Sequence, residues 1–189
     1  MSIISRYRNW AFNRKKTNQL TKWRKKGIIV PDSFSWEDDI RLDISNPFFD
    51  MPGGSIEIGE NVKISKGVII DCFGGRVSIG DNVFIGPYTV IYGHGGITIG
   101  NDTLIGMNCN IVSANHKIPS RFNLIRLQQD ITGKISIGND VWIGGGVTVL
   151  SSVNISSGVV IGANSLIRKD VQQYSIVAGY ENKIIGTRL

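Results

Sequence analysis

Apolar residues recur at every sixth position in the stretch from Ile137 to Val171. A second residue, small or β-branched, follows four positions after each of them, and polar residues and glycines fill most of the remaining places. A repeat of six residues is typical of a parallel β-helix, in which each repeat supplies one short strand and one corner. The leading residues of these repeats are Ile137, Ile143, Val149, Ile155, Ile161 and Ile167.

The same period extends back through three earlier groups of three hexapeptides. All five groups together make fifteen hexapeptides, and fourteen of the fifteen leading residues are Ile. A β-branched side chain packs well on a pleated surface, so we expect these residues to form a buried core. Three strands close one triangular coil, and each coil buries its apolar face against its neighbours. The pattern therefore predicts an all-β protein, a parallel β-helix of about five triangular coils. The earlier leading residues are Ile58, Ile64, Ile70, Ile79, Ile85, Ile91, Ile99, Ile105 and Ile111.

Insertions interrupt the period only after the third strand of a coil. Three extra residues follow Ile70, two follow Ile91 and twenty follow Ile111. All three insertions should therefore stack on one corner of the prism. A long insertion in so regular a repeat is usually functional, so we expect residues 112–134 to form an active-site loop.

The first 27 residues differ in character from the repeats. They carry nine Lys or Arg and no acid, whereas the rest of the chain has twelve basic and fifteen acidic residues. Ile3, Tyr7 and Trp10 share one face of a helix, so residues 1–27 are predicted to form a basic amphipathic helix. Such a helix either covers the open edge of the first coil or makes peripheral contact with an anionic membrane. Nucleic-acid binding is not expected, because no recognised module accompanies the charge.

Residues 28–55 form a transition between this segment and the repeats. Ile28, Phe34 and Ile40 are again six residues apart, which predicts a degenerate first coil. Residues 45–54 contain Asn-Pro and Pro-Gly-Gly and are predicted to be a loop. The regular β-helix is then expected to span residues 56–186.

Composition restricts the class of protein and its expected location. Hydrophobic residues make up 41% of the chain and charged residues 19%, as in soluble globular proteins. No apolar run has transmembrane length and the N-terminus lacks the core of a signal peptide, so we expect a cytoplasmic protein, at the inner face of the membrane if residues 1–27 bind lipid. Two cysteines do not make a disulfide framework, and Cys109, at an inward corner position, is predicted to be a core residue.

The chain has only two histidines, His94 and His116. Both fall in insertions at the same predicted corner, one coil apart. A histidine in a loop is often merely exposed, but the shared corner and the long insertion favour a functional role, because imidazole is the side chain best suited to proton transfer near neutral pH. A zinc hydratase on such a fold is not expected, since two histidines fall short of the three histidine ligands that its metal would need.

Four segments of the sequence resemble the hexapeptide-repeat acyltransferases. They are the repeats themselves, the Ala-Asn-His that opens the long loop, the Gly-Asn-Asp-Val-Trp-Ile-Gly-Gly-Gly-Val after it, and the terminal Ile-Val-Ala-Gly-Tyr-Glu-Asn-Lys-Ile-Ile. The chain is most similar to the sugar and cell-surface-polysaccharide O-acetyltransferases, over residues 56–186. This resemblance implies a left-handed β-helix, a homotrimer with active sites at subunit interfaces, and acetyl-CoA as the acyl donor.

The resemblance also implies roles for individual residues. His116 matches the catalytic base, which would take the proton from an acceptor hydroxyl. A backbone N–H of residues 144–146 would stabilise the oxyanion, although these glycines also suit close packing of the coils. The positions that match the coenzyme A groove and its phosphate contacts are Trp142, Gly144, Gly145, Ala163, Lys169 and Lys183.

Several positions depart from the family pattern. Residues 178–183 read Ala-Gly-Tyr-Glu-Asn-Lys in place of the usual Ala-Gly-x-Pro-Ala-Lys, which loosens the turn and places Glu181 beside the phosphate site. An Asn common in small-sugar acetyltransferases is Gly86 here, and an acid is replaced by a histidine. Simple galactoside or maltose acceptors are therefore not expected. The candidates for acceptor binding are Tyr92, His94, Arg121 and Arg126.

The predicted function is acetyl transfer from acetyl-CoA to a hydroxyl of a sugar or cell-surface polysaccharide precursor, without a metal. Two alternatives remain open from the sequence. One is a non-catalytic β-helix subunit that scaffolds an assembly, and the other is N-acetylation of an amino sugar. Acetylation of an antibiotic or transfer of a longer acyl chain would use the same site.

Overall fold

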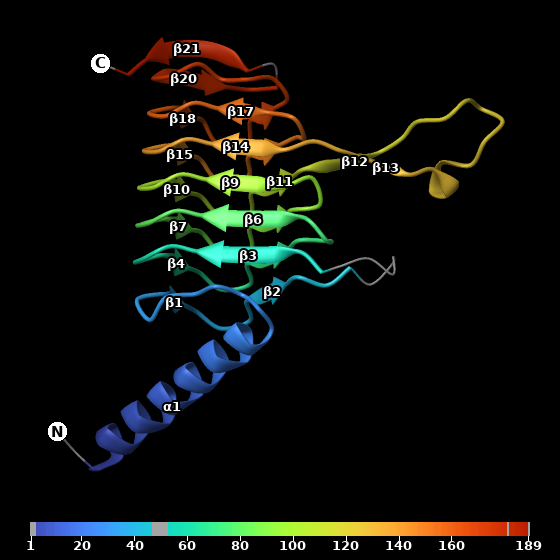
Figure 1. The fold of residues 1–189 in the computed structure, drawn as a ribbon. Coiled ribbons are helices and arrows are strands. Elements are labelled where there is room, and N and C mark those ends of the chain that lie inside the picture. Colours follow the sequence, from blue (N-terminus) through green and yellow to red (C-terminus); the bar gives the residue numbers. More distant parts are fainter. Residues whose placement is uncertain (1–2, 47–52, 181, 189) are drawn as a thin grey trace.

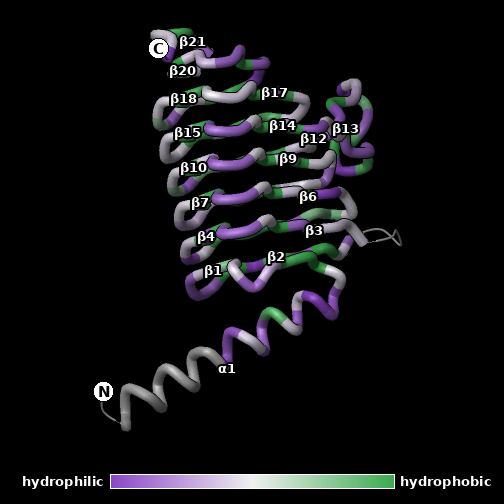
Figure 2. Tube along the Cα trace, turned by 60° about the vertical axis from the view of Figure 1, so that its left-hand side comes forward, coloured by the Kyte–Doolittle hydropathy of each residue, from purple (hydrophilic) through white to green (hydrophobic). Residues whose placement is uncertain are grey.

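The computed structural model describes residues 3–46, 53–180 and 182–188, and their side chains from residue 14 onward. Successive coils stack into a triangular prism, with α1 (Ile3–Lys25) at one end and a long loop projecting from one corner (Figure 1). Hydrophilic and hydrophobic stretches alternate along each coil (Figure 2). This alternation is what the hexapeptide pattern requires of a coil that buries only one side of each strand.

The three faces of the prism are parallel sheets, each made from every third strand of the coils. Equivalent strands pair in register one coil apart, so Ile64 pairs with Ile85, and Ile85 pairs with Ile105. The first face contains β3 (Ser55–Ile58), β6 (Arg76–Ile79), β9 (Ile97–Ile99), β14 (Ile135–Ile137) and β17 (Asn154–Ile155). The second face contains β1 (Ser35–Trp36), β4 (Lys63–Ile64), β7 (Phe84–Ile85), β10 (Leu104–Ile105), β15 (Trp142–Ile143), β18 (Val160–Ile161), β20 (Ser175–Ala178) and β21 (Lys183–Thr187). The third face contains β2 (Arg41–Asp43), β5 (Ile69–Asp71), β8 (Val90–Tyr92), β11 (Asn110–Val112), β16 (Thr148–Val149) and β19 (Leu166–Ile167).

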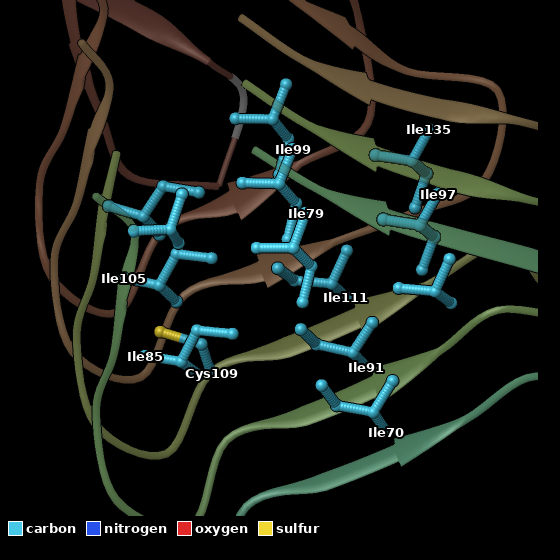
Figure 3. Close-up of a cluster of buried hydrophobic side chains, with 14 of the residues drawn as sticks. Ile70, Ile79, Ile85, Ile91, Ile97, Ile99, Ile105, Cys109, Ile111 and Ile135 are labelled. Carbon is cyan, nitrogen blue, oxygen red and sulfur yellow. The ribbon is translucent and has the colours of Figure 1, made fainter. Parts of the chain in front are cut away.

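The leading residues of the hexapeptides form columns inside the prism. Ile79 lies beneath Ile99, and Ile91 lies beneath Ile111 (Figure 3). All fifteen leading side chains are at most 3% exposed, which confirms the core predicted from the sequence. Strands of two to four residues cannot bury enough surface alone, so the stacking of identical side chains supplies the stability of each coil.

The prism continues beyond the five predicted coils at both ends. β1 pairs with β4 and β2 with β5, so residues 28–46 add a further coil. The sequence predicted this coil from the spacing of Phe34 and Ile40. In the structure the leading positions belong to Trp36 and Leu42, two residues further along, because these residues pair with Ile64 and Ile70. At the other end β21 folds back antiparallel on β20 and covers an edge that would otherwise offer unpaired backbone groups.

α1 covers the open end of the additional coil. Its Leu20 and Trp23 are buried, and Trp23 packs edge-on against Trp36 with ring centroids 4.9 Å apart. Arg24 fastens the end of the helix, because its guanidinium donates a 2.7 Å hydrogen bond to the carbonyl of Val30. The alignment of positions 3, 7 and 10 that predicted an amphipathic helix lies outside the described side chains.

The three insertions stack at the corner between the third and first faces, which we call the loop corner (Figure 1). The long insertion is not structureless, because β12 (Ala114–His116) and β13 (Asp130–Thr132) form an antiparallel hairpin at its base. A short 3₁₀ helix, η1 (Ile125–Leu127), lies beyond the hairpin. The hairpin gives the loop a rigid base, and it places Asp130, on β13, beside His116.

Candidate functional site

The loop corner holds both histidines, and one carboxylate lies between them. His116 pairs with Asp130 across the hairpin, and its Nδ1 lies 2.7 Å from Asp130 Oδ1. His94 reaches the same carboxylate from the coil below, with Nδ1 3.3 Å from Oδ2. The His116 side chain is 74% exposed, whereas those of Asp130 and His94 are 26% and 19% exposed. The structure therefore brings the two predicted histidines together through a third residue.

The two contacts to Asp130 are not equivalent. The shorter contact, to His116, is within hydrogen-bonding distance. Neither contact has the geometry of a full hydrogen bond, and Nδ1 of His94 is buried without a hydrogen-bond partner in the described part of the chain. His94 thus packs against Asp130 as a buried neighbour, while the shorter distance places the carboxylate of Asp130 at Nδ1 of the exposed His116.

Asp130 was not predicted from the sequence. A carboxylate this close to Nδ1 of His116 favours the proton on that nitrogen, which leaves Nε2 free to accept a proton. One sequence signal could have found it, since Asp130 is the single acid among residues 112–134. Its pairing with His116 depends on the hairpin register, which the hexapeptide period does not specify.

Tyr92 lies beside this group and joins it to the coil below. Its ring packs against Phe73 with centroids 4.3 Å apart. Burial raises the pKa of the Tyr92 phenol, and the negative charges of Asp71 and Asp130 raise it further. A neutral phenol is therefore available beside the histidines as a hydrogen-bond donor or acceptor.

Hydrogen bonds tie the hairpin and the His94 turn to the prism. Ser113 donates through Oγ to the carbonyl of Tyr92 and accepts from the N–H of Gly95, at 2.9 and 2.8 Å. Asn115 donates to Oγ of Ser151 at 2.6 Å. These contacts hold the bases of both insertions, so the histidines are supported by a rigid scaffold.

The structure does not bring Arg121 and Arg126 to the histidines within one chain. Both are exposed and line a hollow of about 460 Å³ formed by residues 118–126 of the loop. The same segment exposes large apolar side chains, including Ile118 and Phe122, which are 87% and 83% exposed. So much apolar surface on one loop is typical of a segment that packs against another chain.

The residues matched to the coenzyme A groove gather at another corner, between the second and third faces. Gly144, Gly145 and Ala163 stack there, and the half-exposed Trp142 precedes them on β15. A Cβ on Gly144 would lie 2.6 Å from the backbone nitrogen of Ala163, so close packing of the coils requires this glycine. We call the edge formed by residues 144–146 and 163 the glycine corner.

Gly145 differs from its neighbours in its backbone and its surroundings. The N–H groups of Gly144 and Gly146 donate to Ile161 and Met107. The N–H of Gly145 donates no hydrogen bond to any described residue. A Cβ here would meet the flexible side chain of Met107 at 3.3 Å and its carbonyl oxygen at 3.4 Å, which is an ordinary contact distance. Packing therefore does not require glycine at this position, and its amide remains available to a ligand.

Lys169 and Lys183 lie together at the C-terminal end of the prism. Asn182, which the sequence did not single out, donates to the carbonyl of Lys169 at 2.7 Å and accepts from the N–H of Arg168. This bridge brings the segment of Lys169 to the start of β21, where Lys183 lies. Both lysines are exposed, so together they can hold an anion. Glu181 lies outside the described residues.

The glycine corner and the loop corner lie at opposite edges of the third face. Within the coil that carries His116, the chain passes from β10 through one corner to β11, and then through the other corner to β12. A whole strand of the prism thus separates His116 from the residues matched to the coenzyme A groove. One chain thus holds the predicted residues as two separate halves, one at each corner.

The two cysteine side chains are not part of the predicted site. Cys72 and Cys109 are free and buried, and burial raises the pKa of Cys72 from 9.0 to about 12 and also raises that of Cys109. Both are therefore core residues without nucleophilic character, as predicted for Cys109. Among the described residues, no group of three His, Cys, Asp or Glu side chains could hold a metal ion.

Comparison with known sequences identifies two family models within the repeats. The model of the bacterial transferase hexapeptide (six repeats) matches residues 134–169, and that of the hexapeptide repeat of succinyl-transferase matches residues 76–113. A putative lipopolysaccharide biosynthesis O-acetyl transferase, WbbJ of Escherichia coli K12, is 35% identical over 140 residues, which cover 70% of this chain and 71% of WbbJ. A chloramphenicol acetyltransferase of Klebsiella aerogenes is 48% identical over 56 residues, 30% of this chain and 27% of that protein.

Two solved structures share the fold. AntD, an N-acyltransferase from Bacillus cereus solved as a mutant in complex with dTDP and coenzyme A, has a TM-score of 0.66 at 23% identity, covering 89% of each chain. A maltose O-acetyltransferase from Clostridium difficile 630 has a TM-score of 0.55 at 22% identity, covering 87% of this chain and 72% of that one. At this level of identity the likeness shows the fold, a left-handed parallel β-helix with a single long helix.

Proposed function

This chain belongs to the hexapeptide-repeat acyltransferase family, and we propose that it transfers an acetyl group from acetyl-CoA to a hydroxyl of a sugar or cell-surface polysaccharide precursor. The observation that carries the proposal is the contact of 2.7 Å between His116 Nδ1 and Asp130 at the base of the inserted loop. This is the arrangement that a general base requires. The relative with a named role in lipopolysaccharide biosynthesis supports the choice of acceptor class.

His116 would activate the acceptor. With its Nδ1 proton held by Asp130, Nε2 takes the proton of the hydroxyl while the oxygen attacks the thioester carbonyl of acetyl-CoA. The tetrahedral intermediate then collapses, the C–S bond breaks, and the departing thiolate of coenzyme A takes the proton from His116. Asp130 stabilises the imidazolium formed between these two proton transfers.

The glycine corner would hold the thioester and the pantetheine arm of acetyl-CoA. The uncommitted N–H of Gly145 is the donor best placed to bind the oxyanion, because the N–H groups on either side are used within the prism. Trp142 would lie beside the pantetheine arm, and the small residues Gly144 and Ala163 would leave room for it. Lys169 and Lys183, joined through Asn182, would bind the phosphates.

The complete site would form between copies of the chain. We propose a homotrimer in which the loop corner of one subunit faces the glycine corner of its neighbour. The separation of the two corners within one chain and the exposed apolar side chains of residues 118–127 support this assembly. Packing of the loop on the neighbour would also carry Arg121 and Arg126 toward a site that they do not reach in a single chain.

The acceptor would lie at the loop corner, between Tyr92, His94 and His116. The phenol and the imidazoles can hydrogen-bond sugar hydroxyls, and Phe73 adds an aromatic surface beside them. We place the enzyme in the cytoplasm at the inner face of the membrane, where a lipid-linked glycan precursor would be accessible.

The test is acetyl transfer by the wild-type protein and by a His116→Ala variant. Release of free coenzyme A thiol is followed with a panel of sugars and amino sugars, which also distinguishes O- from N-acetylation. Loss of the base lowers the rate by about 10² to 10⁴, while acetyl-CoA still raises the melting temperature of the variant. A fully active His116→Ala variant would contradict the mechanism, and a protein without any response to acetyl-CoA would favour the scaffold role.

A further inference from the structure

One buried carboxylate at the loop corner has no part in the proposed mechanism. Asp71 is the last residue of β5, and its side chain is only 7% exposed. The strand register pairs it with Tyr92, the last residue of β8 on the next coil. One coil further, the same edge of the third face leads through β11 into the hairpin that carries His116. Asp71 therefore lies beside the candidate acceptor site, two coils from the proposed base, which is about 10 Å.

Two groups bind the Asp71 carboxylate. The guanidinium of Arg41 lies 3.0 Å from Oδ2, and the N–H of Phe73 donates to Oδ1 at 3.3 Å. Arg41 is itself half-exposed, and it is shared with Asp43, which it approaches to 2.9 Å. A single cation between two carboxylates leaves this group with an excess of negative charge.

The turn after β5 requires an oxygen atom at position 71 but not a charge. The amide oxygen of an asparagine can accept the same hydrogen bonds from Phe73 and from Arg41. Burying a carboxylate costs more free energy than burying an amide, and burial raises the pKa of Asp71, although the Phe73 N–H and Arg41 act against this rise. A charge retained at that cost beside a candidate binding site points to a role in binding.

The charge of Asp71 reaches the phenol of Tyr92. Burial raises the pKa of this phenol, and the charges that raise it further are those of Asp71 and Asp130. The Tyr92 hydroxyl makes no hydrogen bond with any residue that the structure describes, and Nδ1 of His94 is likewise without a partner among the described residues. Polar groups that a ligand can bind therefore lie in a field set by two negative charges.

Such a field selects ligands by their charge. A carboxylate or phosphate would be repelled by Asp71 and Asp130, because partly buried charges are little screened by salt. An uncharged hydroxyl can instead donate a hydrogen bond to the phenol or to a carboxylate, and an ammonium group would be attracted. The cations on the first-face side of the corner offset this little, since Arg76 pairs with Glu57 at 2.8 Å and Lys134 is exposed to solvent.

We propose that Asp71 is a specificity-determining residue, which excludes acceptors that carry an acidic group on or next to the reacting sugar unit. The acceptor class is thereby narrowed to uncharged sugars and amino sugars, and uronic acids and sugar phosphates are excluded. This inference rests on the proposed acetyl transfer, and it adds a residue that governs the choice of acceptor without taking part in the chemistry.

The test compares neutral and acidic acceptors in matched pairs. The pairs are the methyl glycosides of glucose, mannose and N-acetylglucosamine and those of the corresponding uronic acids. Release of coenzyme A thiol gives kcat/KM for each, and the selectivity is the ratio of the neutral to the acidic member of a pair. We expect Asp71→Asn to lower this ratio about tenfold, because it removes one partly buried charge. Comparing the same pair in variant and wild type cancels differences in the reacting hydroxyl.

Asp43→Asn is the matched control. Asp43 shares Arg41 with Asp71 and pairs with it in register, but it lies one coil further from Tyr92. Its side chain is 29% exposed, so its charge is better screened, and Asp43→Asn should change the ratio by less than about twofold. Arg41→Gln removes the cation instead and should raise the ratio, which keeps the test decisive if Asp71→Asn does not fold in thermal melts.

The Tyr92 phenol supplies a second readout that needs no acceptor. Its alkaline absorbance titration is obtained as the difference from a Tyr92→Phe variant. Asp71→Asn should move this titration to lower pH, because it removes a negative charge that favours the neutral phenol, and Asp43→Asn should move it much less. A titration that stays in place would show that the charge does not reach the site.

The outcomes separate this inference from the proposed function. An unchanged ratio in Asp71→Asn, an equal fall in Asp43→Asn, or a fall in Arg41→Gln would overturn the role of Asp71 while acetyl transfer itself stands. A wild-type protein that binds acetyl-CoA but acetylates no sugar of either kind would reject the proposed function, and this inference with it.

Discussion

At the scale of single residues, the proposed mechanism depends on Asp130, whose carboxylate lies between two imidazoles. It approaches His116 to 2.7 Å and His94 to 3.3 Å. The shorter contact orients the exposed histidine, and the longer one adds a buried neighbour behind the carboxylate. Asp130 should therefore act on catalysis through His116, and His94, besides its proposed contact with the acceptor, should act through Asp130.

The two contacts predict a graded response to substitution. Asp130→Asn should lower kcat by about 10² or more, because the amide no longer stabilises the imidazolium or fixes the tautomer of His116. His94→Gln should lower it less, by about tenfold, since it removes only the weaker contact. Steady-state rates of both variants, with KM values for acetyl-CoA unchanged, check this order. A His94→Gln variant as impaired as Asp130→Asn would show that His94 acts directly.

The glycine corner offers a matched pair of substitutions on adjacent residues. Gly144→Ala should destabilise the fold by about 1 to 3 kcal/mol, because the new Cβ would lie 2.6 Å from the backbone of Ala163. Gly145→Ala should leave stability nearly unchanged, since its Cβ would meet the flexible Met107 side chain at 3.3 Å and the Met107 carbonyl oxygen at 3.4 Å, yet it should weaken acetyl-CoA binding. Thermal melts with and without acetyl-CoA separate the two effects. If Gly145→Ala instead lowered stability and Gly144→Ala weakened acetyl-CoA binding, the donor groove would have to lie elsewhere.

The buried thiols make stability depend on alkaline pH. The pKa of Cys72 is raised from 9.0 to about 12 in the folded chain, so the unfolded chain loses this proton first as pH rises. The contribution to stability is present below pH 9 and is lost as pH rises toward 12. Unfolding by denaturant between pH 8 and about 10 should show this loss, and Cys72→Ala should reduce it. Rapid reaction of native thiols with a disulfide reagent at pH 8 would contradict the burial.

At the scale of elements, strands of two residues are held by columns of identical side chains rather than by their own length. Ile99 is 1% exposed and lies between Ile79 and Ile137 on the first face. Ile99→Ala should lower the free energy of unfolding by about 2 to 5 kcal/mol. Thr98→Ala, which changes the adjacent outward residue, should cost less than about 1 kcal/mol. Equal losses would mean that the column is not the source of stability.

The elements also show how far sequence reasoning reaches in this fold. The period of six predicted the core columns and the stacked insertions, because every repeat meets the same environment. It could not give the hairpin of β12 and β13, whose register is set by local pairing across the loop. Asp130 was missed for that reason, and Asn182 was missed because its bridge joins two turns whose contact the period of six does not specify. The additional coil was predicted from a true spacing, but its leading residues lie two positions further on.

At the scale of the whole molecule, the proposed catalytic base and the proposed donor groove lie at different corners of the prism. Neither the period nor the fold of one chain brings them together, and only an assembly of copies can do so. Lys169 and Lys183, the residues proposed to bind the donor phosphates, lie at the C-terminal end of the prism, and α1 lies at the opposite end (Figure 1).

The most direct test of a site shared between subunits is complementation between two inactive variants. His116→Ala loses the base, and Gly145→Val fills the donor groove while leaving the loop corner intact. Unfolding and refolding the two variants together forms mixed trimers, in which some interfaces combine an intact His116 with an intact glycine corner. We predict that acetyl transfer by the mixture recovers to a substantial fraction of the wild-type rate, while each variant refolded alone stays inactive. A mixture no more active than its components would contradict a site shared between subunits.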